Sequence, residues 1–345
     1  MDVSALDYEL PTELIAQEPL PQRDASRMLI VDRAKQSWTD SQFRELPQHL
    51  ESGDLLVINN TRVFPARLVG RREPSGGRVE ILLVRELEPD LWEALIKPGR
   101  RLRKWDEMSF GRAHLTAQII DDPGKELRQI RLQSLKSLTS VLDEFGEMPL
   151  PPYISRPAGS SIGDRERYQT LFAKARGAIA APTAGLHFTS DVMDQIAARG
   201  AGLAEITLHV GYGTFEPVRV DDTEQHQVTA EQYEIGSAAA QAINETKVQG
   251  GRVIAVGTTT TRALESAVNE PGFLDPIRGS ATLTIVPGYK FRIVDALLTN
   301  FHLPRSSLLM LVSAFAGHEL ILAAYRHAVA SRYRFYSYGD CMLVI

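Results

Sequence analysis

The chain contains 345 residues, of which 43 % are hydrophobic and 23 % charged, with 38 basic and 43 acidic side chains and one cysteine. This length exceeds what a single hydrophobic core usually organises, so we expect two domains. The composition is that of an ordinary globular protein and excludes collagen, a coiled coil and wholesale disorder. The lone cysteine, Cys341, excludes a disulfide framework within the chain and a zinc site built on cysteine pairs.

The sequence shows no sign of export or membrane insertion. The first ten residues contain acidic side chains and no basic segment ahead of an apolar core, so we expect no secretory signal. The longest apolar stretch, residues 308–317, is about half the ~20 residues that a membrane helix needs. With a single cysteine, which fits a reducing compartment, these features predict a cytoplasmic protein that does not bind a membrane.

The first sixty residues mix helix and strand signals. Residues 28–31 and 55–58 are apolar runs of strand length, and we expect both to be buried strands. Thr12, which follows a proline, is a capping residue for a short helix over residues 13–17.

Between residues 62 and 137 almost nothing is typical of a helix. Strands are expected over residues 79–84, 92–96, 115–119 and 127–132. Between the last two, residues 121–124 (Asp-Asp-Pro-Gly) predict a turn, because proline presets φ and glycine tolerates positive φ. We therefore expect a small antiparallel β unit, and a closed barrel in particular, because closure removes exposed strand edges.

From about residue 150 onward, helix and strand signals alternate, which is typical of a mainly parallel sheet covered by helices. The expected helices span residues 166–175, 190–199, 237–248, 262–269 and 306–330 (two helices), and the expected strands span 178–181, 204–210, 252–256, 282–286 and 333–340. The predicted fold class is therefore α/β. A discontinuous α/β domain comes from residues 1–61 and 150–345, and an antiparallel β-barrel domain is inserted at residues 62–149.

The net charge of −5 argues against a nucleic-acid partner, but it averages over an uneven distribution. Residues 62–104 contain eleven basic and six acidic side chains, a balance of +5, which leaves −10 for the remainder. The densest basic cluster, Arg100, Arg101, Arg103 and Lys104, is followed by Trp105. Basic side chains neutralise phosphates and an aromatic ring stacks on a base, but a solvated strand face has the same composition. Composition alone leaves these two interpretations equally open.

Common nucleotide, metal and hydrolase motifs are absent, and His226 and Glu231 lack the spacing of a helical metal pair. We therefore predict no metal site. Four loops that follow apolar segments are instead dense in glycine, threonine, asparagine or histidine.

The first such loop contains Thr183, Gly185 and His187, between a small-residue strand and a capped helix. Ligands of α/β sheets bind at the carboxyl ends of strands, and small residues let a ligand approach the backbone. The alternative is tight helix–sheet packing, with His187 an ordinary loop histidine, and the two interpretations of this histidine are nearly equal.

The second loop contains Gly211 and Gly213, and His209 lies just before them in the expected strand. A histidine near the carboxyl end of a strand can act as a general base, because its pKa is close to neutral. A core histidine bonded to a carbonyl is the commoner case for an isolated histidine.

The third loop contains four consecutive threonines, including Thr258 and Thr259, ahead of Arg262. Helix capping needs only one of these hydroxyls, so the run favours ligand contact. The fourth loop contains Asn300 and His302 ahead of a long helix.

Together these segments resemble the S-adenosylmethionine:tRNA ribosyltransferase-isomerase family. The resemblance extends from about residue 7 to residue 342, and its motifs are long and unusual. They are, in order, Asp7-Tyr8, Leu10-Pro11, residues 14–17 (LIAQ), 60–68 (NTRVFPARL), 181–188 (APTAGLHF), 207–211 (TLHVG), 256–259 (VGTT), 299–304 (TNFHLP) and 338–340 (YGD).

The resemblance implies an enzyme of queuosine synthesis whose fold is an α/β domain with an inserted β-barrel. It implies transfer of the ribosyl group of S-adenosylmethionine, as co-substrate, onto 7-aminomethyl-7-deazaguanine at the wobble position of tRNA. The products are epoxyqueuosine, adenine and methionine, and neither a metal nor a redox cofactor is required. One departure is Thr229, which stands where many members carry a second histidine. That histidine is therefore dispensable if this protein is active, and we give the neighbouring His226 a minor role.

The reaction assigns expected roles to the motif residues. We expect His187 and His209 to transfer protons, and Thr183, Thr258, Thr259 and Asn300 to hold ribose or methionine groups of the co-substrate. Arg262 either binds the methionine carboxylate or pairs with Glu265 at helical spacing. The remaining expected cofactor-binding residues are Gly185, Gly211, Gly213 and His302. The expected tRNA-binding residues are Arg62, Arg67, Arg100, Arg101, Arg103 and Lys104, in contact with the anticodon arm.

Two other functions are open on the sequence, and we expect a monomer in each case. An S-adenosylmethionine-dependent methyltransferase would release S-adenosylhomocysteine rather than adenine. A catalytically weak relative that only binds tRNA is motivated by Thr229.

Overall fold

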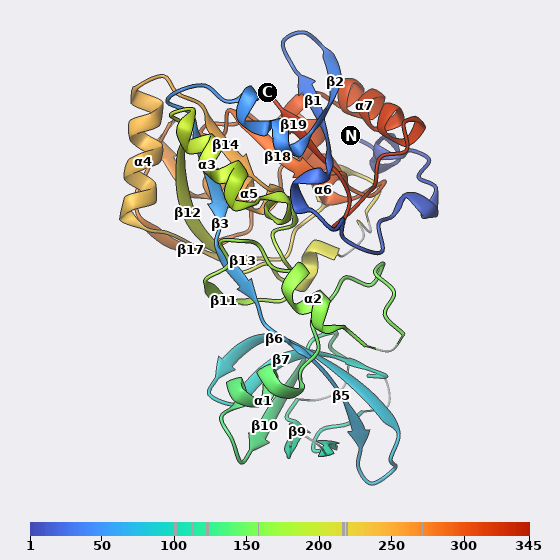
Figure 1. The fold of residues 1–345 in the computed structure, drawn as a ribbon. Coiled ribbons are helices and arrows are strands. Elements are labelled where there is room, and N and C mark those ends of the chain that lie inside the picture. The colour runs from blue at the N-terminus through green and yellow to red at the C-terminus, as the bar shows by residue number, and fades with distance from the viewer. Residues whose placement is uncertain are drawn as a thin grey trace.

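A nine-stranded mixed sheet forms the centre of the larger part of the molecule (Figure 1). The computed structural model describes residues 1–99, 102–111, 114–121, 124–157, 159–215, 218, 220–270 and 272–345. In spatial order the strands are β17 (Ile277–Ala281), β13 (Glu231–Ile235), β12 (Gly202–Leu208), β3 (Leu55–Asn59), β14 (Val253–Val256), β18 (Ala296–Asn300), β19 (Cys341–Val344), β1 (Arg27–Asp32) and β2 (Ser37–Gln42).

The middle of this sheet is parallel and fully buried. Strands β12, β3, β14 and β18 are mutually parallel. Strand β19 pairs antiparallel with β18 and parallel with β1, and β13, β17 and β2 pair antiparallel at the edges. Every residue of β3, β14 and β18 is buried, as expected for strands with helices on both faces. The expected runs at 28–31, 55–58 and 252–256 are therefore strands of one sheet, built from both ends of the chain.

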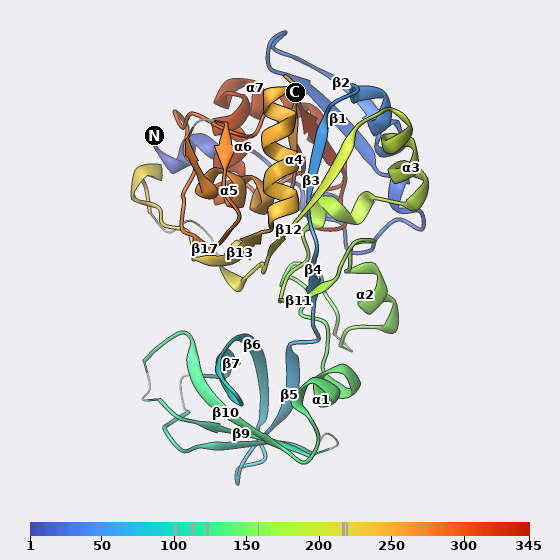
Figure 2. The ribbon, with the colours of Figure 1, turned by 90° about the vertical axis from the view of Figure 1, so that its left-hand side faces the viewer.

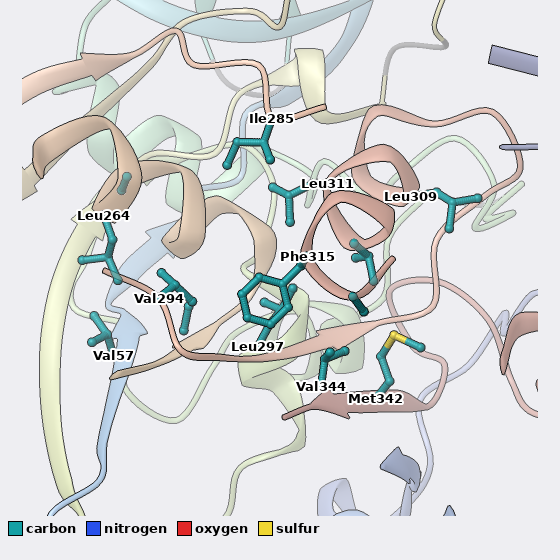
Figure 3. Close-up of a cluster of buried hydrophobic side chains, with 14 of the residues drawn as sticks. Val57, Leu264, Ile285, Val294, Leu297, Leu309, Leu311, Phe315, Met342 and Val344 are labelled. Carbon is teal, nitrogen blue, oxygen red and sulfur yellow. The ribbon is translucent and has the colours of Figure 1, made fainter. Parts of the chain in front are cut away.

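Helices cover the two faces of the sheet. Helices α4 (Ser237–Val248), α5 (Thr258–Ala267), α6 (Ser307–Ala316) and α7 (His318–Ala330) pack on one face, where Val57, Leu297 and Val344 meet Leu264 and Phe315 (Figure 3). The alternate strand residues, such as Leu56 and Leu298, face α3 (Ser190–Ala198) and the 3₁₀ helix η4 (Phe43–His49). Because successive side chains of a strand point to opposite faces, the same strands supply both cores.

The second unit is a closed six-stranded barrel, as the β pattern between residues 62 and 137 predicts. Its strands are β5 (Arg67–Arg72), β6 (Arg78–Glu88), β7 (Leu91–Lys97), β8 (Glu107–Phe110), β9 (Leu115–Ile119) and β10 (Arg128–Ser134). All neighbouring pairs are antiparallel, and β10 pairs with β9 and β7, so no strand edge is left open. Helix α1 (Leu138–Phe145) packs its Val141 and Leu142 on the barrel core.

Two chain segments connect the barrel to the sheet domain (Figure 2). Strand β3 continues into β4 (Thr61–Val63), which pairs parallel with β11 (Ala175–Ala178). On the barrel side, Arg67 and Glu147 exchange two backbone hydrogen bonds of 3.1 and 2.8 Å. The barrel is thus inserted between β3 and the later part of the sheet. Domain boundaries at residues 61/62 and 149/150 stay a prediction.

Several expected elements differ from the structure. In place of a helix over residues 166–175, α2 (Ile162–Arg167) ends early, because the Gln169 side chain bonds both backbone groups of Val63. The next strand begins at Ala175 rather than 178, because Lys174 and Ala175 donate to the Asn60 carbonyl and align the chain with β4.

The other differences lie nearer the carboxyl end. Helix α5 begins at Thr258 rather than 262, because the Thr260 and Thr261 hydroxyls bond to the carbonyls four residues earlier. No strand covers residues 282–286, since β17 ends at Ala281. Residues 333–340 form a loop, because Tyr336 has a φ of 72°, and the strand begins at Cys341.

Smaller elements complete the described chain. The expected helix over 13–17 is a single 3₁₀ turn, η2 (Thr12–Leu14). The turn expected at residues 121–124 includes Asp122 and Pro123, which lie outside the described residues. The remaining elements are η1 (Val3–Leu6), η3 (Arg23–Ala25), η6 (Thr183–His187), η7 (Tyr212–Phe215), η8 (Thr223–Gln225), β15 (Val268–Glu270) and β16 (Phe273–Leu274).

Within the described ranges, no single helix is long and apolar enough to cross a membrane. Helices α6 and α7 together have sufficient length and composition, but they meet at an angle of 117°. Cys341, at the start of β19, is fully buried between β18 and β1, opposite Asn300 and Met28.

Candidate active site

A cavity of about 660 Å³ lies at the carboxyl ends of the parallel strands. Val210 follows β12, Gly257 follows β14, and Asn300 ends β18, and all three line the cavity. Strand β3 continues from the same edge into β4 and the barrel, so the cavity lies at the end of the sheet domain that is joined to the barrel (Figure 2). This is the edge at which open α/β sheets bind ligands.

Five of the residues expected to contact the co-substrate line this cavity together. They are Thr183, Thr258, Thr259, Asn300 and His302, which come from three of the four loops. Gly257 precedes the first turn of α5 with a φ of 97°, which favours glycine and turns the chain sharply from β14 into the helix. The two following threonines, each 6 % exposed, are therefore held at the cavity wall by the helix start.

Asn300 is fixed by two partners. Its Nδ2 donates to the Tyr336 carbonyl at 2.9 Å, and its Oδ1 lies 3.4 Å from His187 Nε2. The His187 Nδ1 is 3.0 Å from the Ser26 hydroxyl. Burial lowers the pKa of His187 to about 4, so its ring is neutral at pH 7.

His187 itself does not line the cavity; it lies behind Asn300. This placement counts against direct proton transfer by His187, because a general base must reach the proton it removes. It favours a positioning role, in which the imidazole orients the Asn300 amide.

His302 is the histidine on the cavity wall in the described part of the chain. Its Nε2 lies 2.9 Å from the Thr299 hydroxyl, its backbone N–H donates to the Tyr325 hydroxyl at 3.1 Å, and its carbonyl accepts from Tyr8. Burial lowers the pKa of His302 to about 3, which keeps the imidazole neutral.

His209 lies one residue beyond β12, at the junction with the β4–β11 pair. Its Nδ1 is 2.8 Å from the Thr61 hydroxyl, and burial lowers its pKa. The ring packs on Gly177, where a Cβ atom would come within 2.6–2.8 Å of three ring atoms. His209 is not among the residues that line the cavity, although its neighbour Val210 is.

Arg262 pairs with Glu231, not with Glu265 as its helical spacing allows. Its Nη1 lies 2.7 Å from Glu231 Oε2, and both side chains are less than 10 % exposed. The remaining guanidinium groups donate to the carbonyls of Leu283 at 3.2 Å and Ala281 at 2.9 Å. Arg262 is therefore engaged within the protein and outside the cavity lining, which is evidence against its binding a methionine carboxylate.

The three glycines expected at the co-substrate site serve packing or backbone contacts. A Cβ on Gly185 would come within 2.8 Å of the Phe172 ring, and a Cβ on Gly213 within 2.5 Å of Thr229. The Gly211 N–H donates to Glu231 Oε1 at 3.0 Å. All three lie outside the cavity lining, so close approach of a ligand does not explain them.

The structure adds cavity residues that sequence reasoning missed. Tyr153 and Tyr336 line one wall, with ring centroids 4.0 Å apart, and Arg305 lines the rim. Tyr336 belongs to an aromatic-rich segment that we interpreted as a strand, and Arg305 directly follows a recognised motif. No signal in the sequence marks Tyr153.

The residues expected to bind tRNA differ in how far their side chains are exposed to solvent. Arg62 on β4 is exposed, whereas Arg67 is half-buried, with its Nη2 on the Leu150 carbonyl at 3.1 Å and its Nε 3.4 Å from Glu80. Arg103 and Lys104 are exposed on a barrel turn, where the Lys104 ammonium lies 5.2 Å from the Trp105 ring centroid. Trp105 is 60 % exposed. Arg100 and Arg101 lie outside the described residues.

The positive balance of residues 62–104 does not extend over the whole insertion. Residues 62–149 contain sixteen basic and fourteen acidic side chains, so the excess is local. Two of these basic side chains, Arg71 and Arg78, line a groove of about 890 Å³. Phe110 and Phe145 line the same groove. Neither arginine forms an ion pair with a described residue.

Metal ligands do not gather within the described ranges: no group of three or more histidine, cysteine, aspartate or glutamate side chains there could hold a metal ion.

Comparison with known proteins places the chain in a family. The family model described as queuosine biosynthesis protein matches residues 3–344. The S-adenosylmethionine:tRNA ribosyltransferase-isomerase of Symbiobacterium thermophilum is 49 % identical over 345 residues and that of Halothermothrix orenii 48 % over 347, each over the full length of both chains. The crystal structure of the S-adenosylmethionine tRNA ribosyltransferase from Thermotoga maritima is 36 % identical, with a TM-score of 0.56 over 99 % of this chain and 100 % of that chain. These matches confirm the resemblance of the motifs: the chain belongs to the queuosine biosynthesis protein family.

Proposed function

We propose that this protein transfers and isomerises the ribosyl group of S-adenosylmethionine onto 7-aminomethyl-7-deazaguanine at the wobble position of tRNA. Epoxyqueuosine is formed, and adenine and methionine are released. The protein is an S-adenosylmethionine:tRNA ribosyltransferase-isomerase, a transferase of queuosine biosynthesis, as its full-length relatives are named. S-adenosylmethionine and tRNA are its substrates.

The observation that carries this proposal is the cavity at the carboxyl ends of β12, β14 and β18. Its volume of about 660 Å³ lies within the range of small-molecule sites. Its lining combines the hydroxyls of Thr183, Thr258 and Thr259 and the amide of Asn300 with aromatic and aliphatic side chains. Hydroxyls and amides suit the ribose, and aromatic rings suit the adenine.

The polar and the aromatic parts of the cavity lining suggest where each part of S-adenosylmethionine binds. The rings of Tyr153 and Tyr336 form an aromatic wall on which the adenine stacks. The Thr258 and Thr259 hydroxyls and the Asn300 amide, held by Tyr336 and His187, bind the ribose hydroxyls. Thr183 faces the same space from η6.

The chemistry begins with removal of a proton from the ribose carbon beside the sulfonium, and adenine is then eliminated. This proton transfer requires a group in contact with the substrate. Among the described residues that line the cavity, His302 is the only histidine and none is a carboxylate, so we assign this contact to His302. Since a pKa of about 3 makes His302 a weak base, the amine of the tRNA nucleobase is a second basic group.

His187 and His209 act from positions around the cavity. His187 positions Asn300. His209 lies next to Thr61, on the segment that joins the sheet domain to the barrel. We retain His209 as a proton-transfer residue toward the tRNA nucleobase, because that base enters from the barrel side.

The exposed cations of β4 and the barrel bind tRNA phosphates. Arg62, Arg103 and Lys104 are exposed, and Trp105 offers a ring for stacking. The anticodon arm is the contacted part, because the reacting base lies there. We keep the monomer and the cytoplasm as the proposed state and location.

The test is incubation with S-adenosylmethionine and tRNA that carries the aminomethyl precursor. Chromatography detects released adenine, and mass spectrometry detects the modified nucleoside. S-adenosylhomocysteine in place of adenine would instead show a methyltransferase, and a tRNA band shift without turnover would show a binding protein only. In a Thr258→Val, Thr259→Val variant we expect adenine release to fall at least tenfold. Thr39→Val, on the exposed strand β2, is the matched control.

A further inference from the structure

An ion pair joins the amino-terminal segment to the loop before α6, at the rim of the cavity. Arg305 lines the cavity, and its Nε donates to Asp7 Oδ2 at 2.8 Å, with Nη2 on the same oxygen. The backbone holds this arginine in place: its N–H donates to the Leu6 carbonyl at 3.1 Å, and its φ is 54°. Residues with a Cβ rarely adopt that left-handed conformation.

Arg305 is the only charged side chain among the described residues that line the cavity. The alternative cation, Arg262, is engaged by Glu231 and two carbonyls. Among the described lining residues, a carboxylate that enters this space therefore has one cationic partner. The amino-acid end of S-adenosylmethionine carries such a carboxylate, with an ammonium group on the same carbon.

The Asp7–Arg305 pair retains capacity for a ligand. Both of its hydrogen bonds go to Oδ2 of Asp7 and use the Nε and Nη2 edge of the guanidinium. In the described chain, Arg305 Nη1 and Asp7 Oδ1 form no hydrogen bond, and the two side chains are 57 % and 41 % exposed. A planar guanidinium binds a carboxylate through two parallel N–H groups, and a carboxylate binds an ammonium.

We infer that Arg305 recognises the carboxylate at the amino-acid end of S-adenosylmethionine, and that Asp7, which does not line the cavity, holds the guanidinium in position. This inference rests on the proposed function, because it takes S-adenosylmethionine as the occupant of the cavity. It assigns to Arg305 one of the two roles that the sequence leaves open for Arg262. Arg305 then discriminates the co-substrate from adenosine derivatives that lack the carboxylate.

The test compares binding of two ligands by isothermal titration calorimetry, in the presence of tRNA that lacks the aminomethyl precursor, so that no turnover occurs. S-adenosylmethionine and its decarboxylated form share the adenine, ribose, sulfonium and ammonium and differ only in the carboxylate. The wild type should bind S-adenosylmethionine about tenfold more tightly than the decarboxylated form. Arg305→Gln should bind the two ligands equally. Asp7→Asn should reduce this preference only in part, because Arg305 keeps its charge but loses the carboxylate that holds it in position.

Arg278→Gln is the matched control, because Arg278 forms an exposed pair with Glu234 at 2.9 Å on β17 and β13, away from the cavity. It should retain the wild-type preference. A preference that persists in Arg305→Gln would overturn the inference while leaving the proposed function intact. If this preference persisted in Arg305→Gln and a filter-binding assay showed weaker tRNA binding, Arg305 would contact phosphate instead. A wild type that binds neither ligand would overturn the proposed function and this inference together.

Discussion

His187 Nε2 lies 3.4 Å from Asn300 Oδ1, so a buried imidazole supports the amide that faces the cavity. The same amide donates to the Tyr336 carbonyl, and Tyr336 forms part of the aromatic wall. One histidine outside the cavity thereby contacts an amide that also bonds the backbone of Tyr336.

His187→Ala should lower the rate of adenine release about 10- to 100-fold without abolishing folding, because it removes only the support of Asn300. Asn300→Ala should lower it at least as much. The double variant should be no slower than Asn300→Ala, since residues that act through one group are not additive. Single-turnover adenine release measures these rates, and circular dichroism checks the fold. A double variant much slower than either single variant would show that His187 acts independently.

The two most buried histidines should make the protein acid-sensitive. Burial lowers the pKa of His187 from 6.5 to about 4 and that of His302 to about 3. Between pH 6.5 and these values the unfolded chain binds protons that the folded chain does not, so stability falls on acidification. From pH 7 to pH 5 the loss should be about 2 kcal/mol for each histidine. Urea unfolding at the two pH values measures it, and an equal loss in His187→Gln and the wild type would contradict the assignment.

Breaking the buried Arg262–Glu231 pair should destabilise the fold. Arg262→Met removes the guanidinium that pairs with the buried Glu231 carboxylate, which should cost about 3–5 kcal/mol in the free energy of unfolding. The double variant Arg262→Met, Glu231→Met should recover much of that loss, because no buried charge remains. Urea denaturation compares the three proteins. If Arg262→Met instead retained full stability and lost only affinity for S-adenosylmethionine, the arginine would be a ligand-binding residue.

Gly177→Ala should displace His209. The added Cβ would lie 2.6–2.8 Å from three atoms of the imidazole, so the ring must move away from the Thr61 hydroxyl. If His209 transfers a proton, adenine release or product formation should fall about 10²-fold or more. Gly236→Ala, where a Cβ meets no atom within 4 Å, is the control. Near-normal turnover in both variants would remove His209 from the mechanism.

Charge reversal on the barrel turn should weaken tRNA binding. Arg103→Glu with Lys104→Glu should raise the Kd for tRNA several-fold and lower the slope of log Kd against log salt by about two. Arg326→Glu with Arg332→Glu, on exposed positions of the sheet domain, is the charge-matched control. Filter binding at several salt concentrations gives the slope. Unchanged binding would identify the turn as a solvated face.

The fold was predictable where a pattern has only one structural solution. Continuous apolar runs such as residues 55–58 are buried parallel strands, and a β-rich segment without helices closed into a barrel. The predicted ends of helices and strands were wrong where a side chain forms hydrogen bonds with backbone that is distant in the sequence. Gln169 ends a helix by binding Val63, a contact 106 residues apart that no local pattern contains.

The sequence predicts which loops form the cavity, but not which of their side chains face it. The loops that contain Thr183, Thr258 and Asn300 converge because they follow strands whose ends share one sheet edge. Whether a side chain faces the cavity or the interior depends on packing. The sequence therefore leaves two interpretations open for His187 and two for Arg262, and the structure shows that each side chain has a partner within the protein.

The thiol of Cys341 can report how often the central sheet opens. The only thiol of the chain is fully buried between two central strands, opposite Asn300, and burial raises its pKa well above that of a free thiol. A disulfide reagent can therefore reach it only when the sheet opens, so the labelling rate reports how often that opening occurs. A ligand that fills the neighbouring cavity should slow this labelling. Affinity can thus be read from unmodified protein, without an introduced probe.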